Sequence, residues 1–176
     1  MLKTICAATA LLAAGIATAS AHMTLERGEA AVGSTYKAVF RVPHGCGGKP
    51  TNVVRVRIPD GVIAVKPMPK AGWTLEKIRG AYDTTYAYYG SQVSEGVREV
   101  VWSGGNLLDD EYDEFVLRGF LTPGLPVGTT LYFPAIQECP DGAAARWIEI
   151  PAEGQDAHEL DGPAPGVKLL EKAGGH

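Results

Sequence analysis

Hydrophobic and polar residues alternate in several short stretches of the chain beyond residue 22. In one stretch Val54, Val56 and Ile58 share one side of an extended chain, and two arginines, Arg55 and Arg57, occupy the other. A period of two is typical of β-strands with one buried face. The pattern predicts short strands at residues 23–25, 36–42, 51–58, 63–67, 73–78, 84–89, 99–102, 113–120, 130–136 and 145–150.

Turn-forming residues separate these stretches. Pro-Asp-Gly occurs at 59–61 and again at 140–142, and Thr-Pro-Gly occurs at 122–124. Each combination favours a tight reversal of the chain. No long helical period follows residue 21, so we expect an all-β protein built as an antiparallel β-sandwich.

The first 21 residues differ from the rest. Lys3 is followed by an apolar run at 5–17 and then by Ala-Ser-Ala at 19–21. This order predicts a secretory signal peptide at 1–21, cleaved after Ala21, and a periplasmic or secreted protein. The sandwich is expected at 22–151, followed by a C-terminal extension at 152–176 that packs in part along it.

Composition narrows the possible functions. The 176 residues include 22 glycines and 12 prolines, 45% are hydrophobic, and the formal net charge is −4. An acidic chain without a basic tract argues against nucleic acid as a partner. Motifs for phosphate loops, dinucleotide binding and the common hydrolases are missing from the sequence, so we expect no catalytic residues of these types.

Cleavage after Ala21 leaves two cysteines, Cys46 and Cys139. An even number in an oxidising compartment predicts one disulfide. A thiolate metal site is the alternative, and the missing Cys-x-x-C spacing disfavours it.

Cleavage would also make His22 the N-terminal residue. Its α-amine and its imidazole can then chelate one metal together. Free α-amines and imidazoles ordinarily have pKa values of about 8 and 6.5, so both groups yield their protons readily to a metal at neutral pH. Two nitrogen donors from one residue suit Cu(II), which favours tetragonal N/O sites.

Several motifs occur along the chain in one order. They are PHGCGGKPT (43–51), VRVRIPDGV (54–62), KPMPKAGW (66–73), VWSGG (101–105), DEF (113–115), FPAIQECPDG…RW (133–147) and PAPGV (163–167). Together they resemble the YcnI-like domain family of exported copper-binding proteins. The resemblance extends from His22 to about Leu169.

The resemblance implies an immunoglobulin-like, cupredoxin-reminiscent β-sandwich. It also implies a single-histidine brace for Cu(II), made by the amine and imidazole of the N-terminal histidine and a glutamate carboxylate, with a tryptophan beside the metal. On this chain these are His22, Glu114 and Trp147, with Glu138 as the alternative glutamate. The carboxylate would offset part of the copper charge. The indole has no strong donor atom and would cover the ion with its π face.

The expected function is to hold Cu(II) for acquisition, storage or delivery, without catalysis. Another periplasmic copper chaperone or a membrane copper transporter is the expected partner. One alternative is an oxidative copper enzyme, which would need a second imidazole from His44, His158 or His176. A metal-free binding or adhesion sandwich is the other.

Overall fold

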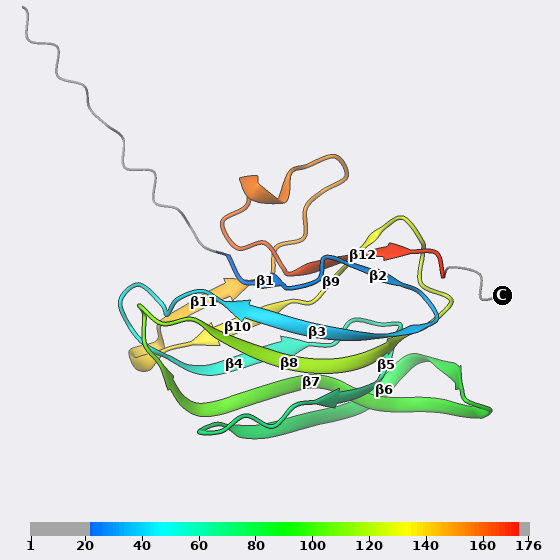
Figure 1. The fold of residues 1–176 in the computed structure, drawn as a ribbon, viewed down its shortest axis with the longest axis horizontal. Coiled ribbons are helices and arrows are strands. Elements are labelled where there is room, and N and C mark those ends of the chain that lie inside the picture. The colour runs from blue at the N-terminus through cyan, green and yellow to red at the C-terminus, as the bar shows by residue number, and fades with distance from the viewer. Residues whose placement is uncertain (1–21, 173–176) are drawn as a thin grey trace, which may run out of the picture.

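The computed structural model describes residues 22–172, which form a β-sandwich (Figure 1). The predicted signal peptide at 1–21 and residues 173–176, including His176, lie outside the described residues. The elements are β1 (Thr24–Leu25), β2 (Glu29–Ala31), β3 (Ser34–Val42), β4 (Thr51–Arg57), β5 (Val62–Pro67), β6 (Thr74–Tyr88), β7 (Ser91–Leu107), β8 (Asp113–Leu121), β9 (Thr130–Tyr132), β10 (Ala135–Glu138), η1 (Pro140–Gly142), β11 (Ala144–Trp147), η2 (Ala157–Glu159) and β12 (Gly166–Leu170).

Two antiparallel sheets form the sandwich, with strand orders β1-β3-β8-β5 and β11-β10-β4-β7-β6. Val54 and Val56 of β4, and Ile58 directly after it, have no exposed surface, so the face predicted to be buried is buried. Burying an aliphatic side chain of this size contributes about 1.5–3 kcal/mol. Trp102, Phe40, Phe115 and Phe133 fill much of the remaining core. The predicted all-β sandwich is confirmed.

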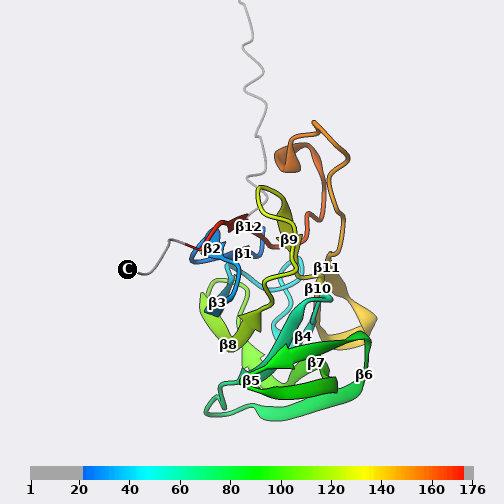
Figure 2. The ribbon, with the colours of Figure 1, turned by 90° about the vertical axis from the view of Figure 1, so that its right-hand side faces the viewer.

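A third sheet with the order β2-β12-β9 lies beside the sandwich, as both ribbon views show (Figures 1 and 2). Strand β12 pairs in parallel with β2 and antiparallel with β9. Two of its side chains, Val167 and Leu169, are 0% and 1% exposed. The segment before β12 carries η2 and projects from the body in both views before the chain returns to this sheet.

Some strand boundaries differ from the sequence pattern. The predicted strands at 73–78 and 84–89 are parts of one strand, β6, which pairs with the long β7. Tyr89 and Gly90, with φ of 46° and 80°, form the turn between them. The predicted strand at 130–136 is divided into two, because the chain changes sheets at Phe133 and Pro134. The N–H of Phe133 donates to the carbonyl of Pro165, and the carbonyl of Pro134 accepts from the N–H of Arg57.

The arrangement places two edge strands where they can share a site. Strand β1 is at one edge of its sheet and pairs with β3, so that Thr24 lies opposite Arg41. Strand β11 is at an edge of the other sheet and ends at Trp147. Within residues 22–172, the structure has no helix that is both long and apolar enough to cross a membrane.

Candidate metal centre

His22 lies against the indole of Trp147. The two ring centroids are 5.7 Å apart and the ring planes meet at 66°, which is an edge-to-face contact. Trp147 is 4% exposed, whereas His22 is half-buried. Two residues that are distant in the sequence and were predicted to share a site are therefore in contact.

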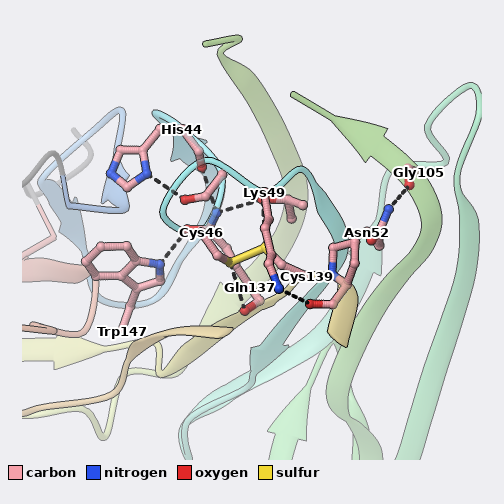
Figure 3. Close-up of a disulfide and its surroundings, with 11 residues drawn as sticks. His44, Cys46, Lys49, Asn52, Gly105, Gln137, Cys139 and Trp147 are labelled. Carbon is pink, nitrogen blue, oxygen red and sulfur yellow. Dashed lines mark hydrogen bonds between the residues drawn. A yellow bond between two sulfur atoms is a disulfide. The ribbon is translucent and has the colours of Figure 1, made fainter. Parts of the chain in front are cut away.

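A buried amide fixes the indole. The Nε1–H group of Trp147 donates to Oε1 of Gln137 at 2.6 Å. Gln137 has no exposed surface, and its Nε2 donates to the carbonyl of His44 at 2.9 Å and to Oγ1 of Thr51 at 3.0 Å. Figure 3 shows this network between the His44 loop and the tryptophan. The orientation of Trp147 is thus set by hydrogen bonds as well as by packing.

Sequence reasoning gave Gln137 no role. The available signal was its position: Ala135, Gln137 and Cys139 alternate along β10 and the residue after it, and all three are buried. A polar residue in a core-facing position of a strand needs a hydrogen-bonding partner. Identifying that partner as Trp147 required the fold.

The predicted disulfide is present between Cys46 and Cys139, which are 93 residues apart in the sequence (Figure 3). The loop around Cys46 is tight, because the N–H of Cys46 donates to the carbonyl of Lys49 at 2.9 Å. A Cβ atom on Gly45 would lie 2.0 Å from that same carbonyl oxygen. Only glycine fits at this position.

His44 begins this loop. Its side chain is half-buried, and its Nδ1 lies 2.6 Å from the carbonyl oxygen of Gly45. Figure 3 shows the His44 ring and the Trp147 indole on the same side of the disulfide. The sequence interpretation treated His44 as a loop residue and as one possible second imidazole.

Glu114 lies on β8, opposite Arg41 of β3. Its carboxylate accepts a hydrogen bond from the Tyr112 hydroxyl and lies 3.9 Å from Nε of Arg41. Burial, followed by this hydrogen bond, raises the pKa of Tyr112. Strand β3 separates β8 from β1, so the backbones of β1 and β8 are about 10 Å apart.

Glu138, the alternative glutamate, follows Gln137 in β10. Adjacent residues of a strand point to opposite faces, so the inward Gln137 places Glu138 on the outer face. There its carboxylate accepts from Nε of Arg55 at 2.5 Å, and Arg55 also pairs with Glu99 at 3.3 Å. The hydrogen bond to Glu138 is the main cause that raises the pKa of Arg55.

The described side chains alone do not make a conventional metal site. Within residues 22–172, His, Cys, Asp and Glu side chains form no group of three that could hold a metal ion. While Ala21 is attached, the main-chain nitrogen of His22 is a peptide nitrogen. The described residues at this place are therefore one imidazole, that of His22, beside one indole, that of Trp147.

Comparisons with known proteins agree with the fold. A solved structure described as an uncharacterized protein from Nocardia farcinica with an immunoglobulin-like fold is 25% identical, with a TM-score of 0.63. The match covers 85% of this chain and 98% of that one. The fold is therefore an immunoglobulin-like sandwich. A search of curated proteins found no match.

A family model described as a domain of unknown function, DUF1775, matches residues 22–169. The matched region contains both sheets of the sandwich, the disulfide, and the contact between His22 and Trp147. The chain therefore belongs to the DUF1775 family, which is the YcnI-like family.

Proposed function

We propose that this protein is exported and binds one Cu(II) ion through the N-terminal histidine of its processed chain. The observation that carries the proposal is the contact between His22 and the buried indole of Trp147. The protein would hold copper for acquisition, storage or delivery and would not be a catalyst.

Cleavage after Ala21 supplies the missing donor. The nitrogen of His22 becomes an α-amine, and the amine and the imidazole of one residue then grip the ion as a chelate. Cu(II) ranks highest among the divalent first-row metals for nitrogen ligands. The family match also begins at His22, the residue that the leader pattern predicts as the new N-terminus.

Trp147 would shield the ion. Its only polar hydrogen is committed to Gln137, so the indole offers its π system and no donor atom. A cation near an aromatic face is stabilised by the ring quadrupole, the more so where water is excluded. The low exposure of Trp147 provides that condition.

The family resemblance assigns a carboxylate as a further ligand, either Glu114 or Glu138. A carboxylate would offset part of the ion's double positive charge. Each of these glutamates already has a cationic neighbour, Arg41 or Arg55 respectively.

The disulfide supports export, since such bonds persist in oxidising compartments. A protein that holds Cu(II) there would exchange it with another copper chaperone or with a membrane copper transporter. The only ground for proposing these partners is that a protein that holds Cu(II) must receive it or pass it on.

The test compares two forms of the protein by calorimetric titration with Cu(II). One form begins at His22 with a free α-amine, and the other begins at His22 with that α-amine acetylated. We expect tight one-to-one binding by the first form and binding about a hundredfold weaker or more by the second, because an imidazole without the amine lacks the chelate advantage. Equal circular dichroism and an intact disulfide would show that both are folded. Equally tight one-to-one binding by both forms would contradict the proposal.

A further inference from the structure

The disulfide contacts the hydrogen-bonded network that orients Trp147 (Figure 3). Sγ of Cys46 lies 3.8 Å from the main-chain carbonyl oxygen of Gln137, and Sγ of Cys139 lies 4.0 Å from Oγ1 of Thr51. Oγ1 of Thr51 accepts one Nε2 hydrogen of Gln137. One sulfur atom therefore lies against the main chain of Gln137, and the other lies against one of its side-chain partners.

The disulfide also holds the loop that supplies the other partner of Gln137. The second Nε2 hydrogen of Gln137 goes to the main-chain carbonyl of His44, two residues before Cys46. Lys49, in the same loop, pairs with Asp141 at 3.1 Å, but the Asp141 side chain is 82% exposed. An ion pair exposed to this degree contributes little to stability. The position of the loop beside β10 therefore depends mainly on the covalent bond.

The disulfide is more open to a reductant on the Cys46 side. Cys46 is half-buried and is followed by two exposed glycines, Gly47 and Gly48, whereas Cys139 is 8% exposed. A Cβ atom on either glycine would have no neighbour within 4 Å. Open space therefore borders the more exposed of the two cysteines.

We propose that the disulfide controls copper binding: the oxidised protein holds Cu(II) beside an oriented indole, and reduction of the bond between Cys46 and Cys139 by a dithiol lowers the affinity. This inference rests on the proposed function and names how that site is regulated. Once the bond is open, the loop carbonyl is no longer held beside Gln137. The amide then loses an acceptor, and the N–H of Trp147 loses its fixed partner. The chelate at His22 is left without an oriented cover.

The reduction balances as a two-electron thiol–disulfide exchange. A thiolate of the dithiol attacks Sγ of Cys46, the S–S bond breaks, and the sulfur of Cys139 leaves as a thiolate. The second thiol of the reductant then displaces Cys46 and closes a disulfide within the reductant. The two protons of the dithiol end on the two cysteine thiols of the protein.

Hydrogen exchange of the indoles in metal-free protein tests the structural part of the proposal. The chain that begins at His22 is compared by heteronuclear magnetic resonance before and after reduction with dithiothreitol. We expect exchange of the Trp147 indole hydrogen to become at least about tenfold faster, because its acceptor Gln137 is no longer fixed. The indole hydrogen of Trp102, which donates to the carbonyl of Met68 at 3.0 Å, is the internal control and should keep its rate.

Two results of this measurement would overturn the proposal. One is an unchanged exchange rate at Trp147. The other is an equal rise at Trp147 and Trp102, because that result is a general loss of structure rather than a local release of one indole.

The effect on copper is tested without a reductant, which would itself reduce Cu(II). The double variant Cys46→Ala, Cys139→Ala, beginning at His22 with a free α-amine, stands for the open bond. We expect it to bind one Cu(II) about tenfold more weakly than the wild type, or weaker still, in calorimetric titration. Wild-type affinity in this variant would overturn the proposal.

Ile63→Ala is the matched control for lost stability. Ile63 is fully buried in β5, which lies at the opposite edge of its sheet from β1. Truncating a buried isoleucine destabilises the fold through the cavity that it leaves. The variant should keep the wild-type copper affinity, and a loss equal to that of the double variant would attribute both effects to stability alone and overturn the proposal.

The two proposals fail in different ways. If the wild-type form that begins at His22 binds no Cu(II), the proposed function fails and control by the disulfide fails with it. If that form binds one ion tightly, and opening the disulfide changes neither the indole exchange nor the affinity, the proposed function stands and only the control is wrong.

Discussion

Gln137 is a buried amide that joins residues from separate segments of the chain. Both hydrogens of its Nε2 are used, on His44 and Thr51, and its oxygen accepts from Trp147. An indole N–H that is buried without a partner costs about 1–3 kcal/mol. The cost explains why a polar side chain occupies a position in the middle of the core.

Replacing Gln137 with methionine keeps the approximate volume and removes these bonds. We expect Gln137→Met to lower the free energy of unfolding by about 1–3 kcal/mol through the indole N–H alone. Copper affinity should fall as well, because Trp147 loses the hydrogen bond that orients its indole beside His22. Urea unfolding measures the first effect. Gln92→Met, at an exposed position of β7, is the matched control, and an equally small change in both variants would contradict this role.

Tyr36 gives a pH-dependent prediction that is independent of copper. Its hydroxyl donates to the carbonyl of Arg27 at 2.5 Å, and the residue is 3% exposed. Burial raises its pKa to about 12, with smaller opposing and reinforcing effects from the charges of Arg27 and Glu26. The folded state therefore retains this proton to a higher pH than the unfolded state does.

The sign of the effect follows from linkage. Below pH 10 both states keep the proton and the stabilising effect is complete. Between pH 10 and pH 12 the unfolded state ionises first, so the free energy of unfolding falls by up to about 3 kcal/mol. Tyr36→Phe should lose this part of the alkaline dependence, measured by urea unfolding at a series of pH values. Tyr89→Phe, at an 86% exposed position, should behave as the wild type. Identical alkaline profiles for Tyr36→Phe and the wild type would contradict the prediction.

Among the elements, the loop from His44 to the start of β4 holds Gln137, the residue that orients Trp147. One disulfide joins it to the end of β10, and the bond between Cys46 and Lys49 closes it on itself. Lys49 further pairs with Asp141 of η1 at 3.1 Å. These contacts hold the loop against the strand that carries Gln137.

Removing the disulfide should affect the whole molecule, because it closes a long stretch of chain. For a separation of 93 residues, the chain-entropy model gives a contribution of about 4 kcal/mol. We expect the double variant Cys46→Ala, Cys139→Ala to lose stability by this order in urea unfolding. The wild type should lose a similar amount in a reducing agent, whereas the double variant should not respond to it. A stability unchanged by both treatments would contradict the expectation.

The alternation of residues predicted the central strands, because burial on one face imposes a period of two. Strand β12 was missed although Val167 and Leu169 are buried on either side of the exposed Lys168, because five residues are too few to establish a period of two. Strand β2, with the short sequence Glu-Ala-Ala, carries too few hydrophobic positions to show a period.

The candidate site was predictable only in part. The leader and the identity of residue 22 suggested a chelating terminus, and the family resemblance pointed to Trp147. The contact between them depends on two edge strands in different sheets, which no local pattern encodes.

At the scale of the whole molecule, the chain is an immunoglobulin-like sandwich of the DUF1775 family with a third sheet beside it. The first described residue packs onto the body rather than leading away from it. A ligand that binds there should therefore stabilise the entire fold. A ligand at a hundred times its dissociation constant raises the free energy of unfolding by about 2.7 kcal/mol.

Thermal unfolding measures how much copper binding stabilises the fold. For the form that begins at His22, saturating Cu(II) should raise the melting temperature by roughly 5–10 °C, since each kcal/mol is worth about 2–4 °C in a domain of this size. The form whose His22 α-amine is acetylated should respond much less at the same copper concentration. An equal shift in both forms would place the copper elsewhere on the molecule.

The most direct measurement is crystallographic. Crystals of the chain that begins at His22, loaded with Cu(II), should give one strong anomalous peak at the copper absorption edge. The peak should lie about 2 Å from both the α-amine and an imidazole nitrogen of His22, beside the indole of Trp147. A copper peak remote from His22, in crystals where this N-terminus is ordered, would contradict the account.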